Sequence, residues 1–165
     1  RGLGDVYKRQ VLLSKAPKLP LKAYDDLGTF KLYTLDLGVL RKLSELDASI
    51  LLLPTPAYTE YKGALAENYI LQSLTAQFQM PFRYWTSGNK AEVDFLLQYI
   101  NQIYPIEVKA DQNIQGKSLI QYEKLFQPAC RIRYSMLNLK QDGNLLNIPL
   151  FLADKTRELL GVINV

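Results

Sequence analysis

The sequence contains no histidine, and this absence excludes several kinds of catalytic site at once. Serine–histidine–aspartate and cysteine–histidine triads, histidine-liganded zinc and imidazole acid–base chemistry all need that side chain. Any catalysis in this chain therefore has to use carboxylates, lysine, tyrosine or a metal ion.

Cysteine and long apolar runs are scarce as well. Cys130 is the single cysteine among the 165 residues, so neither an internal disulfide nor a cysteine-cluster zinc site can form. The longest aliphatic run, Ile50–Leu53, is far shorter than the roughly 20 apolar residues that cross a bilayer. No N-terminal segment resembles a secretory signal. We therefore expect a cytoplasmic protein that makes no use of a membrane.

The charge balance says little about partners. The chain has 20 basic and 16 acidic residues, a net charge of +4. This excess favours an anionic partner such as DNA or RNA only weakly, because ordinary protein surfaces show it too. With 48% hydrophobic and 22% charged residues, the chain can bury a core of ordinary size.

Composition divides the chain into three parts. Residues 1–10 follow neither a helical nor a strand period and resemble translated sequencing-adapter read-through, so they are left out of fold reasoning. Residues 11–56 are expected to link the chain to an upstream region, and residues 57–165 to form the domain. Pro54 and Pro56 mark the boundary, because proline interrupts regular structure.

Hydrophobic periodicity predicts alternating helices and strands. The expected helices are residues 36–46, with Asp36 as N-cap, 59–78, 116–126 and 154–160. The expected strands are residues 30–35, 82–85, 92–99, 104–110, 131–137 and 147–152. This order predicts an α/β fold in which a mixed central β-sheet is flanked by helices.

One carboxylate interrupts the apolar stripe of the long helix. Steps of three and four residues define the stripe, which contains Ala64, Glu67, Leu71, Leu74 and Phe78. A carboxylate held there without a partner is costly, so we expect Glu67 to meet a cation, a metal ion or hydrogen-bond donors. The alternative is that Glu67 lies at the edge of the stripe and reaches water.

The strands 92–99 and 104–110 carry charged residues that alternate with apolar ones. The charged residues are Asp94, Glu107 and Lys109, and the apolar ones are Val93, Phe95, Leu97, Ile106 and Val108. If the two strands form a hairpin with their apolar side chains on the same face, the residue numbers of the two members of each pair add up to an odd number. A turn centred on residues 101–102 meets this condition and sets Leu97 opposite Ile106 and Asp94 opposite Lys109. Glu107 is then diagonal to Asp94, at roughly 7–8 Å between backbones, so both carboxylates can reach one ion.

Two carboxylates and a lysine on one face have two interpretations. Carboxylate oxygens suit magnesium or manganese, which need few protein ligands, and a lysine beside the ion can position an attacking water. The alternative is a ladder of salt bridges on a solvent-facing sheet, which is common and weakly stabilising. Spacing alone favours this alternative.

The residues VDF at 93–95, followed by IEVK at 106–109, resemble the D…(D/E)xK signature of PD-(D/E)xK nucleases, the restriction-endonuclease-like superfamily. In that superfamily two acids bind the metal, a lysine assists the water, and a helical glutamate supports the site. The resemblance implies that Asp94 and Glu107 hold magnesium or manganese.

The same resemblance assigns the remaining site residues. It implies that Lys109 assists the water and that Glu67 is the supporting helical acid, which makes all four residues candidates for catalysis. Nuclease-like folds also contact the phosphate backbone at the start of the helix after the lysine strand. Lys117, Ser118 and Gln121 are therefore candidates for nucleic-acid binding, with a solvated helix start as the alternative.

A longer resemblance covers roughly residues 25–155. Its segments are FKLYTLDLGVL (30–40), YKGALAENYILQSL (61–74), FRYWTSGNKAEVDFLL (82–97), YPIEVKA (104–110) and IPLFLA (148–153). Together they resemble the domain of unknown function at the C-terminus of many prokaryotic AAA-type ATPases. This implies an upstream ATPase domain as partner. The chain has no Gly-x-x-x-x-Gly-Lys-Ser/Thr stretch, so we expect no ATP site within it.

Two main functions stay open at this point. The first is a magnesium-dependent phosphodiesterase acting on DNA or RNA. The second is a non-catalytic binding or regulatory module of an AAA-type ATPase, because fold similarity does not guarantee chemistry. A purely structural cap on the upstream region is a third possibility, and it predicts binding of neither ions nor nucleic acid.

Overall fold

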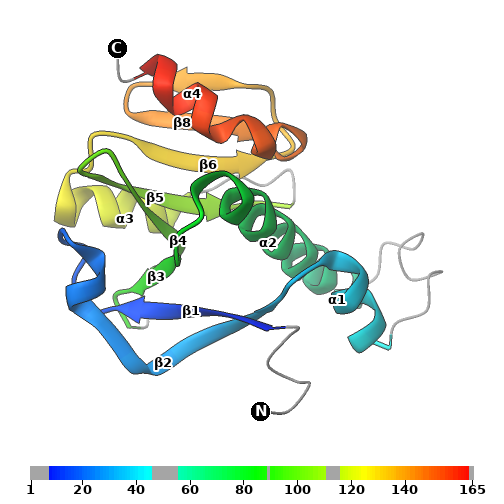
Figure 1. Ribbon diagram of the computed structural model, residues 1–165. Helices are drawn as coiled ribbons and strands as arrows, with labels where there is room; N and C mark the ends of the chain where they lie inside the picture. The colour runs from blue at the N-terminus through cyan, green and yellow to red at the C-terminus, as the bar shows by residue number, and fades with distance from the viewer. Residues whose placement is uncertain (1–7, 46–55, 89, 111–115, 164–165) are drawn as a thin grey trace.

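Eight strands form one mixed sheet in the part of the chain that the computed structural model describes, residues 8–45, 56–88, 90–110 and 116–163. The strands are β1 (Lys8–Ser14), β2 (Asp25–Thr34), β3 (Arg83–Thr86), β4 (Glu92–Tyr99), β5 (Gln102–Val108), β6 (Arg131–Ser135), β7 (Lys140–Asp142) and β8 (Leu145–Pro149). The helices are α1 (Leu37–Leu43), α2 (Pro56–Phe78), α3 (Lys117–Phe126) and α4 (Thr156–Ile163), with short 3-10 segments η2 (Leu21–Tyr24) and η4 (Leu150–Lys155). The order across the sheet is β2-β1-β3-β4-β5-β6-β8-β7. Figure 1 shows β1 and β2 at one end of the sheet and β8 with α4 at the other.

The predicted α/β class, with a mixed central sheet flanked by helices, is confirmed. The predicted strand at 92–99 coincides with β4, and Asp36 caps α1 as predicted, because its side chain accepts a hydrogen bond from Val39 N at 2.8 Å. Strands β1 and β7 were not predicted, and the strand predicted over 147–152 ends at Pro149, where η4 follows. None of the described helices is long and apolar enough to span a membrane.

Strand β1 begins at Lys8, within residues 1–10, which were not expected to belong to the fold. Lys8, Arg9 and Gln10 pair with Thr34, Tyr33 and Leu32 of β2. Residues 11–56, expected only to link the chain to an upstream region, supply the rest of β1 and all of β2. These strands join the main sheet because β1 pairs in parallel with β3. Such a pairing connects segments far apart in the sequence, so no local period reveals it.

Two hydrophobic cores lie on the two faces of the sheet. One contains Ile70, Leu71 and Leu74 of α2 with Phe95 and Leu97 of β4. The other contains Leu119 and Tyr122 of α3 with Trp85, Val93 and Leu96. Leu96 and Leu97 enter different cores because neighbouring residues of a strand point to opposite faces. Helices α2 and α3 therefore cover opposite faces of the sheet.

A β-bulge interrupts the alternation of β4 between Val93 and Leu96. Across the bulge the pairs are Arg83 with Leu96 and Trp85 with Val93, so two steps along β3 correspond to three along β4. The prediction that Val93 shares a face with Phe95 and Leu97 is wrong, because Val93 packs in the core on the α3 side. The inserted residue reverses the alternation within this part of the strand.

The hairpin of β4 and β5 has a different register from the predicted one. The pairs run from Tyr99–Gln102 to Phe95–Ile106. Ile100 and Asn101 form the turn, with φ of 45° and 56°, as in the two-residue turns that match the twist of a hairpin. Paired numbers still add up to an odd total, as predicted, but the turn lies one residue earlier. The predicted pair Asp94–Lys109 is therefore wrong, since the observed register, continued by one residue, sets Asp94 opposite Glu107.

Two anchors hold the ends of the edge strand β2. At its start, Nε and Nη2 of Arg83 donate to the two carboxylate oxygens of Asp25 at 2.8 and 2.9 Å. At its end, Thr34 N donates to Asn68 Oδ1 at 2.9 Å, and Asn68 Nδ2 donates to Thr34 O at 3.3 Å. Asn68 is only 2% exposed. The strand is thus fixed to β3 at one end and to α2 at the other.

We predict that Asn68→Ala lowers the free energy of unfolding by about 2–3 kcal/mol. The substitution leaves the backbone N–H and C=O of Thr34 buried without these partners. Urea denaturation followed by circular dichroism measures the change. Gln72→Ala, at an exposed position of the same helix, is the matched control and should alter the stability by less than about 0.5 kcal/mol. Equal effects of the two substitutions would show that the anchor does not stabilise the fold.

Candidate carboxylate site

Strands β4 and β5 separate at one end of their hairpin. The pair Phe95–Ile106 is the last one between them. Beyond it, β4 continues only beside β3, and β5 only beside β6. Asp94 and Glu107 are the first residues after the last pair, so they lie at the fork between the two strands.

Asp94 bridges this fork. Its Oδ2 accepts a hydrogen bond from the backbone N–H of Val108 at 2.7 Å, a donor that no longer has a partner on β4. Burial and the negative charge of Glu67 raise the pKa of Asp94 to about 7, although the Val108 N–H and Lys31 act in the opposite direction. The charge of Glu107 contributes to the increase as well. The charges of both other predicted carboxylates therefore act on Asp94.

Glu107 is the most deeply buried of these acids, at 2% exposed. Its Oε1 forms an ion pair with Lys109 Nζ at 3.1 Å. Its Oε2 is buried and has no hydrogen-bond partner among the described residues. A buried carboxylate oxygen without a donor is costly, so it is either a source of strain or one half of a binding site.

Glu67 comes to the fork from helix α2. Its Oε2 accepts a hydrogen bond from the hydroxyl of Tyr33 at 2.9 Å. Tyr33 is 9% exposed and packs against Phe95, with ring centroids 5.5 Å apart. Burial, followed by the charge of Glu67, raises the pKa of Tyr33 above its usual value, so the tyrosine stays a neutral donor. The expectation that Glu67 meets a hydrogen-bond donor agrees with this contact.

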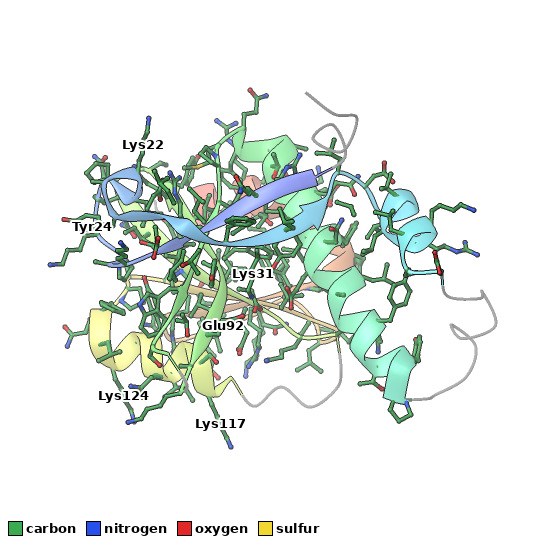
Figure 2. All side chains as sticks on the ribbon, turned by 90° about the horizontal axis from the view of Figure 1, so that it is seen from below. Lys22, Tyr24, Lys31, Glu92, Lys117 and Lys124 are labelled. Atoms are coloured by element: carbon green, nitrogen blue, oxygen red, sulfur yellow. The ribbon has the colours of Figure 1, made fainter. Side chains whose placement is uncertain are left out.

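A second lysine enters the site from the edge strand β2. Lys31 Nζ forms an ion pair with Glu92 and lies 5.0 Å from the ring centroid of Tyr84. Burial works against its charge, but the hydrogen bond and attraction of Glu92, with the charges of Glu67 and Asp94, raise the pKa of Lys31 above its usual value. Figure 2 shows Lys31 and Glu92 close together near the middle of the view, whereas other labelled lysines lie at the periphery.

We call this group of six side chains the carboxylate site. Its members are Glu67, Asp94, Glu107, Lys31, Lys109 and Tyr33. The charges of Glu67 and Glu107 act on Asp94, and an ion pair joins Glu107 to Lys109. The name thus includes all four residues predicted as catalytic, and their catalytic role stays a prediction. The side chains of the site thus come from segments far apart in the sequence, including β2 and β5.

A pocket lies next to the site, between β2, α1 and α2. Its volume is about 370 Å³. The lining residues are Lys31, Leu32, Tyr33, Thr34, Leu40, Ala64, Glu67 and Asn68. Lys31, Tyr33 and Glu67 belong to both the pocket and the carboxylate site, so solvent and small polar groups can reach the site from this side.

The predicted nucleic-acid contacts lie in the first turns of α3. Lys117 is exposed, and Gln121 is half-buried. Ser118 Oγ accepts a hydrogen bond from Glu92 N at 3.4 Å, which brings the start of α3 to the start of β4. Ser118 therefore lies near Glu92, and the binding role of all three residues stays a prediction.

A metal ion needs ligand atoms grouped around one point. Within the described residues, no three histidine, cysteine, aspartate or glutamate side chains are grouped so as to hold an ion. Magnesium, however, is commonly held by one or two carboxylates and keeps several waters. Asp94 and Glu107 are two such carboxylates, with oxygen ligands of the kind that magnesium prefers. Oε2 of Glu107 has no hydrogen-bond partner in the described structure. The residues present therefore fit magnesium or manganese bound by two acids.

Sequence reasoning did not identify Lys31, Tyr33 or Glu92. The available signal was weak: Lys31 and Tyr33 alternate with Phe30 and Leu32, so they share one face of a strand. Nothing in that alternation shows that this face meets β4, which follows some 60 residues later in the chain. The hydrogen bond between Tyr33 and Glu67 is likewise visible only once the strands are assembled.

Comparison with known proteins gives one match. The model of the family described as Domain of unknown function (DUF4143) matches residues 62–151, just over half of the chain. This range contains Glu67, Asp94, Glu107 and Lys109, whereas Lys31 and Tyr33 precede it. No curated protein matches the chain. No solved structure matches it.

We predict that Asp94→Asn stabilises the protein at neutral pH by more than about 1.4 kcal/mol, the free energy of one pKa unit. The pKa of Asp94 is about 7 in the folded chain and ordinarily 3.8, so the folded state binds the proton more tightly. This contribution is fully present below the ordinary pKa and is lost as the pH rises through the folded one. Asparagine keeps an acceptor for Val108 N and never acquires the charge.

Urea denaturation at several values between pH 4 and pH 8 tests this prediction. The wild type should lose stability over that range relative to Asp94→Asn. Asp142→Asn, which neutralises an exposed carboxylate in β7, is the control and should follow the wild type. Parallel pH curves for Asp94→Asn and the wild type would contradict the prediction.

Proposed function

This chain belongs to the family described as Domain of unknown function (DUF4143), and we propose that it is a divalent-metal-dependent phosphodiesterase acting on nucleic acid. The supporting observation is Oε2 of Glu107, at the fork of β4 and β5, which has no hydrogen-bond partner among the described residues. Asp94 lies opposite Glu107 in the continued register, so two carboxylates from adjacent strands are available to one ion.

The side chains of the site have distinct roles in this proposal. Asp94 and Glu107 hold magnesium or manganese. When bound, the ion would neutralise charge on the phosphodiester and generate a nucleophile from water. Lys109, next to Glu107 and about one-third exposed, orients that water from the solvent side. Glu67 is fixed by Tyr33 and sets the charge around Asp94.

The finer family assignment is part of the same proposal. Asp94, followed by Glu107 and Lys109, resembles the D…(D/E)xK signature, and Glu67 resembles the helical acid of the PD-(D/E)xK nucleases. A mixed sheet with helices on both faces is compatible with that superfamily. The substrate would be DNA or RNA, with Lys117, Ser118 and Gln121 near its phosphate backbone.

A second candidate function is a non-catalytic binding or regulatory module. The observation in its favour is that Glu67 and Oε1 of Glu107 already have protein partners, and that no three ligands are grouped among the described residues. In this case the partner would be an AAA-type ATPase domain. A change in ATPase rate when this chain is added to such a domain supports it, and an unchanged rate with no complex in gel filtration excludes it.

We predict that the purified protein nicks supercoiled DNA or cleaves RNA in the presence of magnesium or manganese. Asp94→Asn, Glu107→Gln and Lys109→Ala should each reduce the rate at least about a hundredfold, because each removes a metal ligand or the lysine beside it. Agarose gels with supercoiled plasmid and a labelled RNA measure the cleavage, with and without chelator.

Lys140→Ala and Asp142→Asn are the matched controls. Both side chains are exposed in β7, at the far edge of the sheet, and each removes one charge of the same sign as a site substitution. They should leave cleavage unchanged. Cleavage that survives both Asp94→Asn and Lys109→Ala would exclude these residues as its source. Metal binding without any cleavage would support the non-catalytic module instead.

A further inference from the structure

Strand β2 forms one edge of the sheet, because within the described residues it pairs with β1 alone. Figure 1 shows it as the outermost strand at its end of the molecule. The backbone N–H and C=O groups of an antiparallel strand point alternately to its two sides, so an edge strand leaves half of them without a partner strand. Which residues of β2 carry these free groups decides what can pair with it.

Thr34 shows which residues of β2 face outward. Its N–H and C=O bind the side chain of Asn68 on α2, on the side away from β1. Thr34 is therefore a non-hydrogen-bonded member of its pair with Lys8, and by alternation the backbone groups of Leu32 and Phe30 point outward as well. In the described part of the chain, these outward groups of Leu32 and Phe30 have no hydrogen-bond partner.

The stretch Phe30–Leu32, which we call the open edge, is closed at both ends. At one end Asn68 occupies the backbone groups of Thr34. At the other end residues 27–29 form a bulge that has no partner on β1. The open edge thus offers two N–H and two C=O groups. One antiparallel strand can bind all four through two hydrogen-bonded residue pairs.

The side chains of the open edge also suit an added strand. Phe30 and Leu32 are 43% and 54% exposed, on the opposite face from Lys31. Lys31 lies between them in the sequence, and its ammonium group is paired with Glu92. Residues opposite each other on neighbouring strands lie on the same face. Apolar residues opposite Phe30 and Leu32 would therefore cover both side chains.

We infer that the open edge binds an extended segment of a partner protein, which adds to the sheet as an antiparallel strand. Two apolar residues of the segment lie opposite Phe30 and Leu32 and exchange hydrogen bonds with them. The residue between these two lies opposite Lys31, beside the pocket that Lys31 and Glu67 line. It is uncharged, because Lys31 repels a cation and already has Glu92 as its acid, whereas Glu67 repels a further anion. The inference does not depend on the proposed metal site.

A second copy of this chain fits the open edge less well. Two copies related by a twofold axis bind all four backbone groups only when Phe30 of each copy lies opposite Leu32 of the other. That register places the two Lys31 side chains directly opposite each other, and like charges in this position destabilise the pairing. The other twofold registers set one outward residue opposite the bulge or opposite Thr34, so half of the groups stay unpaired.

A synthetic peptide with the central sequence Val-Thr-Val, flanked on each side by serine and lysine and blocked at both ends, tests the inference. We predict that it shifts the amide signals of Phe30 and Leu32 in NMR spectra of the isotope-labelled full chain. Their hydrogen exchange should slow at least about tenfold at saturation, because both N–H groups become hydrogen-bonded. Titration measures the dissociation constant.

N-methylated peptides with the same side chains are the matched controls. Methylation of both valines removes the two N–H donors that face β2 and should weaken binding at least about tenfold. Methylation of the threonine removes a donor that faces away from β2, so the affinity should stay within about threefold of that of the parent peptide. Equal effects of the two methylations would contradict strand addition.

Side-chain substitutions test the proposed chemistry of the segment. Phe30→Ala should weaken binding at least about threefold, because it removes apolar surface that the peptide covers. Phe151→Ala is the matched control, since Phe151 is 74% exposed in η4, at the other end of the molecule, and it should bind as the wild type does. Replacement of the peptide's threonine by lysine or by glutamate should weaken binding in both cases.

Leu32→Pro distinguishes a partner segment from a second copy. The N–H of Leu32 faces outward, so proline removes a donor that the fold itself does not use. This variant should fold, as judged by circular dichroism, and should lose peptide binding. If it fails to fold, the methylated peptides still decide. Unchanged signals of Phe30 and Leu32 at millimolar peptide overturn the inference. A wild-type dimer in analytical ultracentrifugation that dissociates in Leu32→Pro overturns it in favour of a second copy.

Discussion

The fork between β4 and β5 is the constraint on which the candidate site depends. In two strands that stay paired, the backbone N–H and C=O groups form hydrogen bonds with each other. A side-chain carboxylate is then not needed as an acceptor. Because they separate after Phe95 and Ile106, the N–H of Val108 needs another acceptor, and Asp94 supplies it. A bulge lies in the same part of β4, between Val93 and Leu96. Burial and the charges of Glu67 and Glu107 raise the pKa of Asp94 at this opening, and the charge of Lys31 acts in the opposite direction.

This arrangement is costly for stability, which is typical of functional sites. Burial and like charges hold the pKa of Asp94 far above its usual value, and one oxygen of Glu107 has no donor in the described structure. A fold selected for stability alone would replace such residues by apolar ones of similar volume. In the proposed function, a metal ion bound by Asp94 and Glu107 would offset this cost.

Much of the secondary structure could be predicted from local patterns, but the pairing could not. The period of β4, the cap of Asp36 and the long helix carrying Glu67 are local features, and each appeared where the pattern indicated. The register of the hairpin depended on whether Asn101 was the first or the second turn residue. With Asn101 second, the pairing ends at Phe95–Ile106 and the predicted pair Asp94–Lys109 does not form. Lys31 was not predicted as a site residue because its strand, β2, pairs with β1, and β1 in turn joins the rest of the sheet by its parallel pairing with β3. Long-range pairing of this kind leaves no trace in a sequence window.

The two anchors of β2 have a consequence for the fidelity of strand pairing. An edge strand with a free side can slide along its neighbour, and a slip of one residue turns every side chain to the other face. In β2 such a slip would bring Phe30 and Leu32 to the carboxylates and expose Lys31 and Tyr33 to solvent. The Arg83–Asp25 pair at one end and the Asn68–Thr34 pair at the other would both have to break before the strand could move. The register of β2 is therefore fixed at the two ends of the strand. Lys31 and Tyr33 are kept on the side of the carboxylates by contacts outside the carboxylate site.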